Sequence, residues 1–367
     1  MKAICSKINL KEAVGLCEKI TGKNLSLPVL SNILISGEGR RLKLTSTNLE
    51  IGLSVEIPAK IEEKGMITVP SGVINNFLSS LSLDENITLE SQHNSLLVLT
   101  SDTSTLIKGQ PCDDFPVLPT AKDGNVFEIP ASEFVSGLKS VNYAASFLNI
   151  KPEISSVYVA SDKAVPLTFV STDSFRLAEK KTNLFFPGFK NILIPIKSVS
   201  EILRIFDGKK GMLKLTLNKN QIFISLDGID FISRLTEGIF PDYQQIIPTK
   251  FIADAVLDKN SFAAAMKTAS IFSGKLNEVS IGVDPESDFM TVSTSSQESG
   301  EHTGKIKAKT IGEKIKMSFN HRYIHDCLQH ISSKEIILRF AGEEKPLVIS
   351  GTDDNSFRYL VMPMNTL

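Results

Sequence analysis

An amphipathic segment occurs three times in the chain at a constant spacing. Its first copy, residues 67–82, has the sequence ITVPSGVINNFLSSLS, which predicts a short strand, a proline break and a helix with one apolar face. The helix face repeats every 125 residues, first as Ile74, Phe77, Leu78 and Leu81, then as Val199, Ile202, Leu203 and Phe206, then as Ile324, Cys327, Leu328 and Ile331. Such regularity predicts three copies of one domain.

Other positions keep the same spacing. The residues before the helix are Val69–Pro70, Ile194–Pro195 and Phe319–Asn320, and Phe115–Pro116 recurs as Phe240–Pro241. Polar stretches containing proline follow the two Phe-Pro pairs and are typical of linkers. We therefore predict domain boundaries at 1–124, 125–251 and 252–367.

Each copy also begins with a short strand and an amphipathic helix. The apolar faces of these first helices are Leu10, Val14 and Cys17, then Phe134, Leu138 and Val141, then Phe262, Met266 and Ala269. Asn9 with Glu12 resembles a capping box, and Asp258 is a candidate N-cap. Alternating β-branched runs after each helix predict three strands. The predicted class is α+β, with each domain formed by two helices packed on two antiparallel sheets.

Composition excludes some classes of protein. An apolar content of 42% and a charged content of 22% are ordinary for a globular chain, and the net charge of −1 indicates no particular partner. The four cysteines form no CxxC pair, which favours a reducing compartment over disulfides or zinc. No stretch is long and apolar enough to span a bilayer, so we expect a cytoplasmic protein without a membrane partner.

The polar faces of the helices carry lysine and arginine. The exposed positions are Lys19, Lys139, Lys197, Arg204, Lys267 and Arg322, and the loops after the first helices add Lys23, Lys151 and Lys275. Glu12, Glu201 and Asp326 weaken the pattern. Two interpretations stay open from charge alone: a surface that attracts phosphates without reading bases, or an ordinary solvated helix face.

No catalytic or metal-binding pattern is convincing. His321 and His325 are spaced i, i+4 on a helix, but no third ligand lies nearby in sequence. The run Thr172–Arg176 contains an acid and an arginine without a histidine, and both Walker and GxGxxG motifs are missing. We predict no catalytic residues, no cofactor and no metal.

Three segments, taken together with the triple repeat, resemble one family. They are TDSFRLAEKK at 172–181, GIFPDYQQIIP at 238–248 and YLVMPMNTL at 359–367. They resemble the bacterial DNA sliding clamp, the beta subunit of DNA polymerase III holoenzyme. The resemblance implies a homodimeric ring of six domains, closed head to tail around double-stranded DNA, with the helices lining the hole. Such a ring binds DNA without sequence preference and catalyses nothing.

The resemblance also implies partners. The ring would tether the catalytic subunit of DNA polymerase III, the clamp loader and other proteins that carry short clamp-binding motifs. These motifs would dock in an apolar groove between the second and third domains. The residues of the implied groove are Ile154, Thr172, Ser174, Phe175, Arg176, Leu177, Pro241, Gln245, Ile246, Leu360, Val361, Met362, Pro363, Met364 and Asn365. Members of the family often have Gly-His at Ser174–Phe175 and a basic residue at Gln245 and Asn365, so we expect a more apolar groove here.

Two further surfaces follow from the resemblance. The implied DNA-contacting loops contain Lys23 and Asn24, and Asn149, Ile150 and Lys151; the helix cations that would accompany them are Lys139, Lys197, Arg204, Lys267 and Arg322. The implied dimer interface pairs Thr105, Ile107 and Lys108 with Ile271 and Phe272 of the other chain, with Glu298 and Glu301 as opposite charges to Lys108.

Two alternatives belong to other classes of protein. The first is a repeat-domain scaffold that binds proteins but not DNA. The second is an enzyme that uses the region Thr172–Arg176, which would require a substrate or metal there and an ionised Asp173 facing Arg176.

Overall fold

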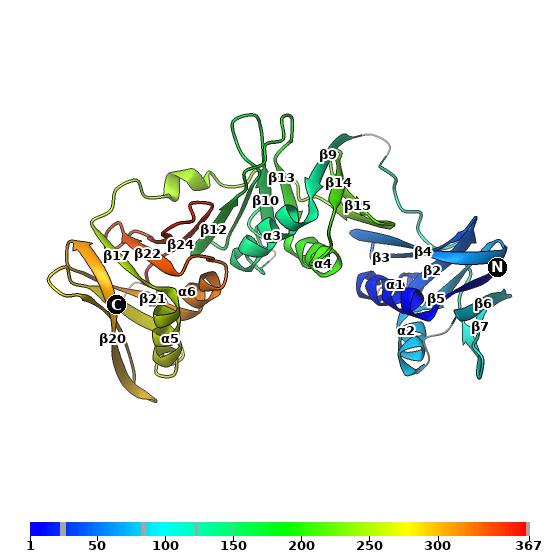
Figure 1. Ribbon diagram of the computed structural model, residues 1–367, viewed down its shortest axis with the longest axis horizontal. Helices are drawn as coiled ribbons and strands as arrows, with labels where there is room; N and C mark the ends of the chain where they lie inside the picture. The colour runs from blue at the N-terminus through cyan, green and yellow to red at the C-terminus, as the bar shows by residue number, and fades with distance from the viewer. Residues whose placement is uncertain (23–26, 82–85, 122–123, 149, 365–367) are drawn as a thin grey trace. The chain divides into compact units, whose positions relative to one another are not determined.

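The structure, a computed structural model, describes residues 1–22, 27–81, 86–121, 124–148 and 150–364 (Figure 1). Contacts divide the chain into two compact units. The first unit comprises Met1–Ser132 and Glu201–Leu235, and the second comprises Glu133–Ser200 and Thr236–Leu367. The predicted middle copy is thus shared between the two units. The predicted boundaries at 124 and 251 remain a prediction.

In the first unit, twelve antiparallel strands form one sheet that contains residues of two copies. From the first copy come β1 (Lys2–Ser6), α1 (Lys7–Ile20), β2 (Asn32–Glu38), β3 (Arg41–Thr47), β4 (Ile51–Glu63), β5 (Gly65–Pro70), α2 (Ser71–Ser80), β6 (Asn86–Gln92), β7 (Ser95–Leu99) and β8 (Ser104–Lys108). The second copy adds β9 (Asn125–Pro130), β14 (Met212–Leu217), β15 (Gln221–Leu226) and β16 (Ile229–Arg234). The main path of the sheet is β8-β7-β6-β1-β4-β16-β15-β14-β9, and β3, β2 and β5 extend from β4.

The second unit contains a second sheet of twelve strands, in the order β13-β10-β11-β12-β24-β23-β22-β17-β20-β19-β18-β21. The second copy supplies β10 (Ser156–Ala160), β11 (Thr168–Thr172), β12 (Arg176–Lys181) and β13 (Ile192–Pro195). The third copy supplies β17 (Ala253–Asp258), α5 (Lys259–Ser270), β18 (Glu278–Val283), β19 (Phe289–Ser296), β20 (Gly300–Gly312), β21 (Ile315–Asn320), α6 (His321–Leu328), β22 (Glu335–Phe340), β23 (Leu347–Gly351) and β24 (Phe357–Val361).

Two helices of the second copy, α3 (Ala131–Val141) and α4 (Ile196–Phe206), have residues in both units. Short 3-10 turns occur at Pro28–Ser31, Asn142–Ala144 and Tyr243–Ile246. Within the described residues, each copy has two helices and eight strands in the predicted order of strand, helix and three strands, twice over. The α+β prediction is therefore confirmed.

The apolar helix faces predicted from the repeat are mostly buried. Ile74, Ile202 and Ile324 are fully buried, as are all nine residues predicted for the first helices. Phe77 and Leu203 are half-buried, while Leu81 and Ile331 lie beyond the last residue of their helices. In the first unit α1 packs on β3 and β4, and in the second unit α5 packs on β19 and β20. Helices α1 and α5 thus each cover strands of their own copy.

Helix capping follows the sequence in only one of the two predicted cases. Asp258 caps α5, because its carboxylate accepts a hydrogen bond from the backbone N–H of Ser261. The capping box of Asn9 with Glu12 is wrong: α1 already begins at Lys7 with Ser6 as its N-cap, so both residues lie inside the helix. The sequence pattern predicts this helix correctly, but the capping box predicts its N-cap at Asn9, three residues after the observed N-cap, Ser6.

Successive copies are joined by strand pairing, which we call seams. At the first seam β4 pairs with β16, and at the second seam β12 pairs with β24. An equivalent backbone hydrogen bond occurs at each seam. At the first seam the N–H of Arg234 donates to Glu50 O (3.0 Å), and at the second the N–H of Met362 donates to Phe175 O (2.8 Å). The repeat in sequence is therefore also a repeat in how copies join.

The length of one strand explains why the middle copy is divided. β4 has 13 residues and pairs with β3 along its first part and with β1 along its last, which joins the two halves of the first copy. β20, also of 13 residues, does the same with β19 and β17. Their counterpart β12 has six residues and, within the described chain, pairs only with β11 and β24.

None of the helices formed by the described residues combines the length and apolar character that crossing a membrane requires.

Candidate binding surfaces and the second seam

The turn before β12 satisfies its own polar groups. Thr172 Oγ1 donates to the carbonyl of Arg176 (2.6 Å) and accepts from the N–H of Ser174 (3.2 Å). Asp173 Oδ1 accepts from the N–H groups of Phe175 (2.9 Å) and Arg176 (3.0 Å). Ser174 has a φ of 78°, a left-handed conformation that the surrounding bonds maintain. The turn holds the side chain of Phe175 in solvent, 61% exposed.

Arg176 links the second copy to the third. Its side chain is 8% exposed, Nε donates to Asp173 Oδ2 (2.9 Å), and Nη1 donates to Asp326 Oδ2 on α6 (2.6 Å). Its guanidinium lies 4.5 Å from the ring centroid of Tyr323 and 5.8 Å from that of Tyr143. Burial by itself would lower the pKa of Arg176, but Tyr359 and the two carboxylates outweigh it and raise the pKa.

These contacts argue against the enzyme alternative. The acid and the arginine of Thr172–Arg176 are engaged with each other and with Asp326, so neither group is free to bind a substrate. No cluster of three or more His, Cys, Asp or Glu suited to a metal occurs among the described residues. Burial, Arg322 and His325 lower the pKa of His321, which favours its neutral form.

An apolar surface lies over the second seam. Phe175 (61% exposed), Ile246 (53%) and Met362 (37%) expose large apolar side chains there. Pro241 is exposed, and Ile154, Pro363 and Met364 are half-buried. The N–H of Met364 donates to Ser318 O (2.8 Å), which fixes the chain after β24. Phe175 and Met362, which a backbone hydrogen bond joins, thus present two neighbouring apolar groups at the end of the seam, of the kind that a peptide groove requires.

Other predicted groove residues support this surface from below. Thr172, Leu177, Leu360 and Val361 are 7% exposed or less. The segment 236–252, which we call the connector, places Phe240 and Tyr243 in a buried cluster with Leu177, Leu360, Val170, Leu193 and Val348. Phe240 stacks on Tyr158 with ring centroids 5.1 Å apart. Gln245 is exposed and donates to Asp242 Oδ2 (2.8 Å), and Asn365 lies outside the described residues.

The first seam has a turn with the same backbone conformation as the turn before β12, but it presents different side chains. Thr47 Oγ1 donates to Ile51 O (2.8 Å), Asn48 Oδ1 accepts from Glu50 and Ile51, and Leu49 has a φ of 77°. The positions that correspond to Phe175 and Met362 are Glu50 and Arg234, because the same hydrogen bond joins each pair. The first seam therefore presents two charges where the second presents two apolar groups.

Sequence reasoning missed several residues that shape the second seam. Asp326, Tyr323 and Tyr143 surround Arg176, and Tyr243 supports the groove from the connector. Asp326 is 150 positions from Arg176, and its place on α6 suggested only a charge that weakens a basic face. For Tyr243, the sequence offered only its place in the FPDY segment, which belongs to one of the three runs that resemble the family.

The residues predicted to face DNA are exposed where the structure describes them. Lys139, Lys197, Lys267 and Arg322 are exposed on helices α3 to α6, and Lys151 is exposed in a turn, all in the second unit. Arg204, in the first unit, forms an ion pair with Glu201 (2.7 Å) and donates to Leu16 O (3.2 Å). Lys23, Asn24 and Asn149 lie outside the described residues. Exposure agrees with both interpretations of the basic faces.

The residues predicted for a dimer interface lie along two strand edges. Ile107 is buried, Thr105 is half-buried and Lys108 is exposed on β8. Within the described chain, β8 pairs only with β7, and Gly300–Lys307 of β20 pairs only with β19. Beside β20, Ile271 is 68% exposed, and Phe272 stacks on His302 at 5.8 Å. Glu298 pairs with Lys275 (3.1 Å), and Glu301 is exposed.

Comparisons with known proteins agree on one family. Three family models match almost the whole chain: the DNA polymerase III beta subunit N-terminal domain at residues 1–119, its central domain at 128–242 and its C-terminal domain at 244–365. The beta sliding clamp of Synechococcus elongatus is 26% identical over 374 residues, covering 99% of both chains, and that of Bacillus subtilis is 25% identical over 380 residues, covering 100% of both.

Solved structures share the fold. The crystal structure of the Bacillus subtilis DNA polymerase sliding clamp superposes with a TM-score of 0.94 at 24% identity, with both chains covered completely. A sliding clamp from Pseudomonas aeruginosa bound to griselimycin gives 0.94 at 23% identity, again over both complete chains. Because all three family models match in order, the chain belongs to the family of the DNA polymerase III beta subunit, the bacterial DNA sliding clamp.

Proposed function

We propose that two copies of this chain form a closed ring around double-stranded DNA, which holds the replicative polymerase and other DNA-processing proteins at their substrate. The observation that carries the proposal is the repeated seam. The second copy contributes β16 to the copy before it and β12 to the copy after it. Within the described residues, the equivalent strands at the outer edges, β8 and residues 300–307 of β20, have no such partner. A second copy of the chain would satisfy both edges at once.

The two seams within the chain predict the register of the proposed third seam. Cys5 pairs with Ala59 and its counterpart Leu257 pairs with Ala308, so Ile51 corresponds to Gly300. Lys108 corresponds to Arg234, because the same series of strand pairings leads from Ile4 to Ser104 and from its counterpart Glu128 to Asp230. If the first seam is transferred to β8 and β20, we expect Thr105 opposite His302 of the partner subunit, and Lys108 diagonal to Glu301 of the partner subunit.

Disulfide trapping tests both the ring and this register. Thr105 and His302 correspond to Phe231 and Leu53, which by the alternation of hydrogen bonds form a non-hydrogen-bonded pair with closely spaced Cα atoms. The double variant Thr105→Cys with His302→Cys should form covalent dimers on mild oxidation. Thr105→Cys with Thr303→Cys, shifted by one residue to the opposite face, is the matched control. A strict monomer by light scattering, or equal trapping in both variants, would overturn the proposal.

A ring would be retained on DNA by topology rather than by tight binding. Its contacts to phosphates must then be weak, because a deep sequence-specific minimum would stop sliding. Protein loaded by the clamp loader with ATP onto nicked circular DNA should stay bound and leave when the DNA is linearised. Retention that is indifferent to linearisation would indicate ordinary charge attraction, and no retention at all would favour a scaffold that does not bind DNA.

Exposed cations of the second unit are the proposed phosphate-binding groups. Replacing Lys151 and Lys197 with alanine should reduce the slope of log affinity against log salt by about one for each phosphate that the protein no longer neutralises. Lys43→Ala, on the exposed side of β3, is the control with an equal loss of charge per residue. A slope that does not change in the double variant would remove these two lysines from the DNA surface.

The apolar surface of the second seam is the proposed site for partner peptides. Griselimycin, with which the clamps of Pseudomonas aeruginosa and Bartonella birtlesii have been crystallised, is a convenient probe. Phe175→Glu with Met362→Arg recreates the charged pair of the first seam and should weaken binding of griselimycin and of partner peptides at least tenfold. Glu50→Gln with Arg234→Gln, at the first seam, should leave both affinities unchanged. Equal affinity in the two double variants would place the site elsewhere.

In this role the chain catalyses no reaction itself. It works by keeping an enzyme close to its substrate, which raises the local concentration without any chemical step. A replication clamp acts on chromosomal DNA, so we place the protein in the bacterial cytoplasm.

A further inference from the structure

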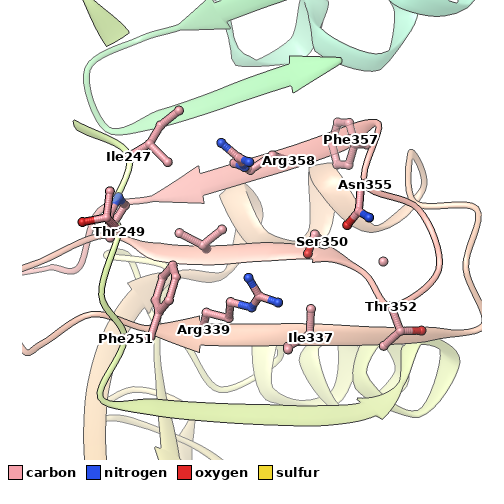
Figure 2. Close-up of a pocket in the computed structure, with 13 residues that line it drawn as sticks. Ile247, Thr249, Phe251, Ile337, Arg339, Ser350, Thr352, Asn355, Phe357 and Arg358 are labelled. Carbon is pink, nitrogen blue, oxygen red and sulfur yellow. The ribbon is translucent and has the colours of Figure 1, made fainter. Parts of the chain in front are cut away.

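A pocket of about 440 Å³ opens on the sheet of the second unit, beside the proposed groove. Figure 2 shows it between the connector residues Ile247–Phe251 and the strands β22, β23 and β24. Ile247 and Phe251 lie at one end of the pocket, and Thr352 and Asn355 lie at the other. None of these residues belongs to the groove predicted from the family resemblance, so the pocket has no role in the function proposed above.

Two arginines from different strands reach into this pocket. By strand pairing, Arg339 on β22, Val348 and Ser350 on β23 and Arg358 on β24 lie on one face of the sheet. Figure 2 shows Ser350 between the two arginines. Arg339 lines up through Val348 with Leu360, two residues from Arg358, so the two arginine Cα atoms are about 12 Å apart, a distance that two extended arginine side chains can bridge. Both guanidinium groups are therefore available to one bound group.

Neither arginine is neutralised by the carboxylate that faces it. Asp254 lies directly opposite Arg339, and Glu179 lies directly opposite Arg358. Glu179 is instead paired with Lys181 at 2.7 Å, and Asp254 Oδ1 is buried without a hydrogen-bond partner. Within the described residues, neither guanidinium has a carboxylate oxygen within the 4.0 Å of an ion pair. Their N–H donors are thus free to bind a carboxylate in a bidentate fork.

The rest of the lining indicates what kind of ligand would carry that carboxylate. The ring of Phe251 lies 5.6 Å from the Arg339 guanidinium, and Ile337 adds an apolar wall. Ser350 and Asn355 supply further hydrogen-bonding groups. A mixture of apolar walls, two cations and a few polar groups suits a peptide with acidic side chains better than a nucleic-acid backbone, whose phosphates would face these apolar walls.

The pocket and the proposed groove share two elements. Arg358, Leu360 and Met362 alternate along β24 and therefore lie on one face, and Ile246 and Ile247 are neighbours in the connector. Arg358 and Met362 are four residues apart, about 13 Å along the strand, which four to six residues of an extended peptide can span. We propose that the pocket binds acidic side chains of the same partner segment whose apolar residues occupy the groove. This inference rests on the proposed function.

The test compares three forms of one peptide on the full-length dimer. The probe is the clamp-binding segment of the DNA polymerase III catalytic subunit from the same organism, labelled with fluorescein. One form has neutral flanks, one has two acidic residues four to six positions before the apolar motif, and one has them after it. One acidic form should bind about three- to tenfold more tightly than the neutral form in low salt, and the gain should fall as salt rises.

Variants assign the gain to the pocket. Arg339→Gln with Arg358→Gln should abolish the gain and leave the affinity of the neutral form unchanged. Arg40→Gln, which removes one exposed guanidinium from the first unit, should keep the gain. Circular dichroism checks that the double variant is folded, which we expect because Arg339 is exposed and Arg358 is only half-buried.

The outcomes separate this inference from the function on which it rests. If the neutral form binds and Phe175→Glu with Met362→Arg weakens it, the groove stands. An acidic flank that then adds nothing, or adds as much in the double arginine variant, overturns the pocket alone. A double arginine variant that loses DNA affinity but keeps its preference for acidic peptides also overturns it. Failure of the neutral form to depend on the groove residues contradicts the proposed function.

Discussion

Arg176 is the residue whose removal should damage the second seam most. Its guanidinium donates to Asp173 at 2.9 Å and to Asp326 at 2.6 Å, and it lies against the rings of Tyr323 and Tyr143. Arg176→Met keeps most of the apolar stem but leaves two carboxylates without their cation. Because Asp173 belongs to the second copy and Asp326 to the third, the change breaks a link between copies.

The magnitude follows from burial. Removing one partner from a buried ion pair typically costs about 3–5 kcal/mol, because the other charge stays desolvated. Asp173 is 15% exposed, whereas Asp326 is 36% exposed and can recover much of its hydration. We therefore expect a loss of about 3 kcal/mol in the free energy of unfolding. Arg176→Lys should lose less, because an ammonium replaces the charge but cannot reach both carboxylates as a fork.

The natural composition of the chain supplies the assay. All five tyrosines lie in the second unit, and the chain has no tryptophan, so intrinsic fluorescence reports on that unit alone. A loss of about 3 kcal/mol should lower the urea midpoint of the tyrosine signal by about 1 M, since a unit of this size has a denaturant slope of about 3 kcal/mol per molar.

A matched variant makes the result decisive. Arg41→Met removes an exposed ion pair to Glu56 (3.4 Å) in the first unit and should leave the tyrosine midpoint unchanged. A shift for Arg176→Met that corresponds to less than about 1 kcal/mol would refute the view that this arginine holds the second and third copies together.

Three further outcomes follow from the structure. Gly137→Ala should destabilise the second unit by about 1–3 kcal/mol and lower the urea midpoint of the tyrosine fluorescence, because a Cβ at this position overlaps the ring of Phe169. Gly15→Ala should not destabilise the protein, because a Cβ there has no neighbour within 4 Å. Burial and Lys139 lower the pKa of His330 in the folded protein, so His330 takes up a proton in the unfolded chain at a higher pH than in the folded one. The free energy of unfolding should therefore fall as the pH drops below about 6.5. His330→Gln should reduce this pH dependence, as measured by urea titrations at pH 7.5 and 5.5. Burial raises the pKa of Cys5 and Cys17 to about 12 and raises that of Cys327 further. In the native protein at pH 8, a thiol reagent should therefore modify at most the half-buried Cys112. In urea the same reagent should modify all four cysteines.

The repeat was the part of the fold that the sequence could reveal. A buried helix face needs apolar residues at fixed spacing, so Ile74, Val199 and Ile324 had to match, and the structure buries all three. The order of helices and strands followed from the same periodicity. The N-terminus of α1 did not, because Ser6 begins the helix without a side-chain hydrogen bond, and no polar pattern marks it.

Contacts between copies could not be derived from periodicity. Pairing of β12 with β24 joins segments about 180 residues apart. Its register is weakly marked in the sequence, because four consecutive residues of β12 are buried and the strand does not alternate. The exposed Phe175 was named through the family resemblance, yet its exposure results from the turn conformation at Ser174. The division into two units depends on where β12 ends, which the sequence does not mark.

The difference between the two seams sets how many partners one ring can hold. A ring of two chains would contain six seams: two with the charged pair Glu50 and Arg234, two with the apolar pair Phe175 and Met362, and two between chains. Only the apolar pair would attract a hydrophobic motif, so two proteins could be bound at once. A polymerase that dissociates from one position could therefore be replaced by a protein already waiting at the other, while the ring stays on the same stretch of DNA.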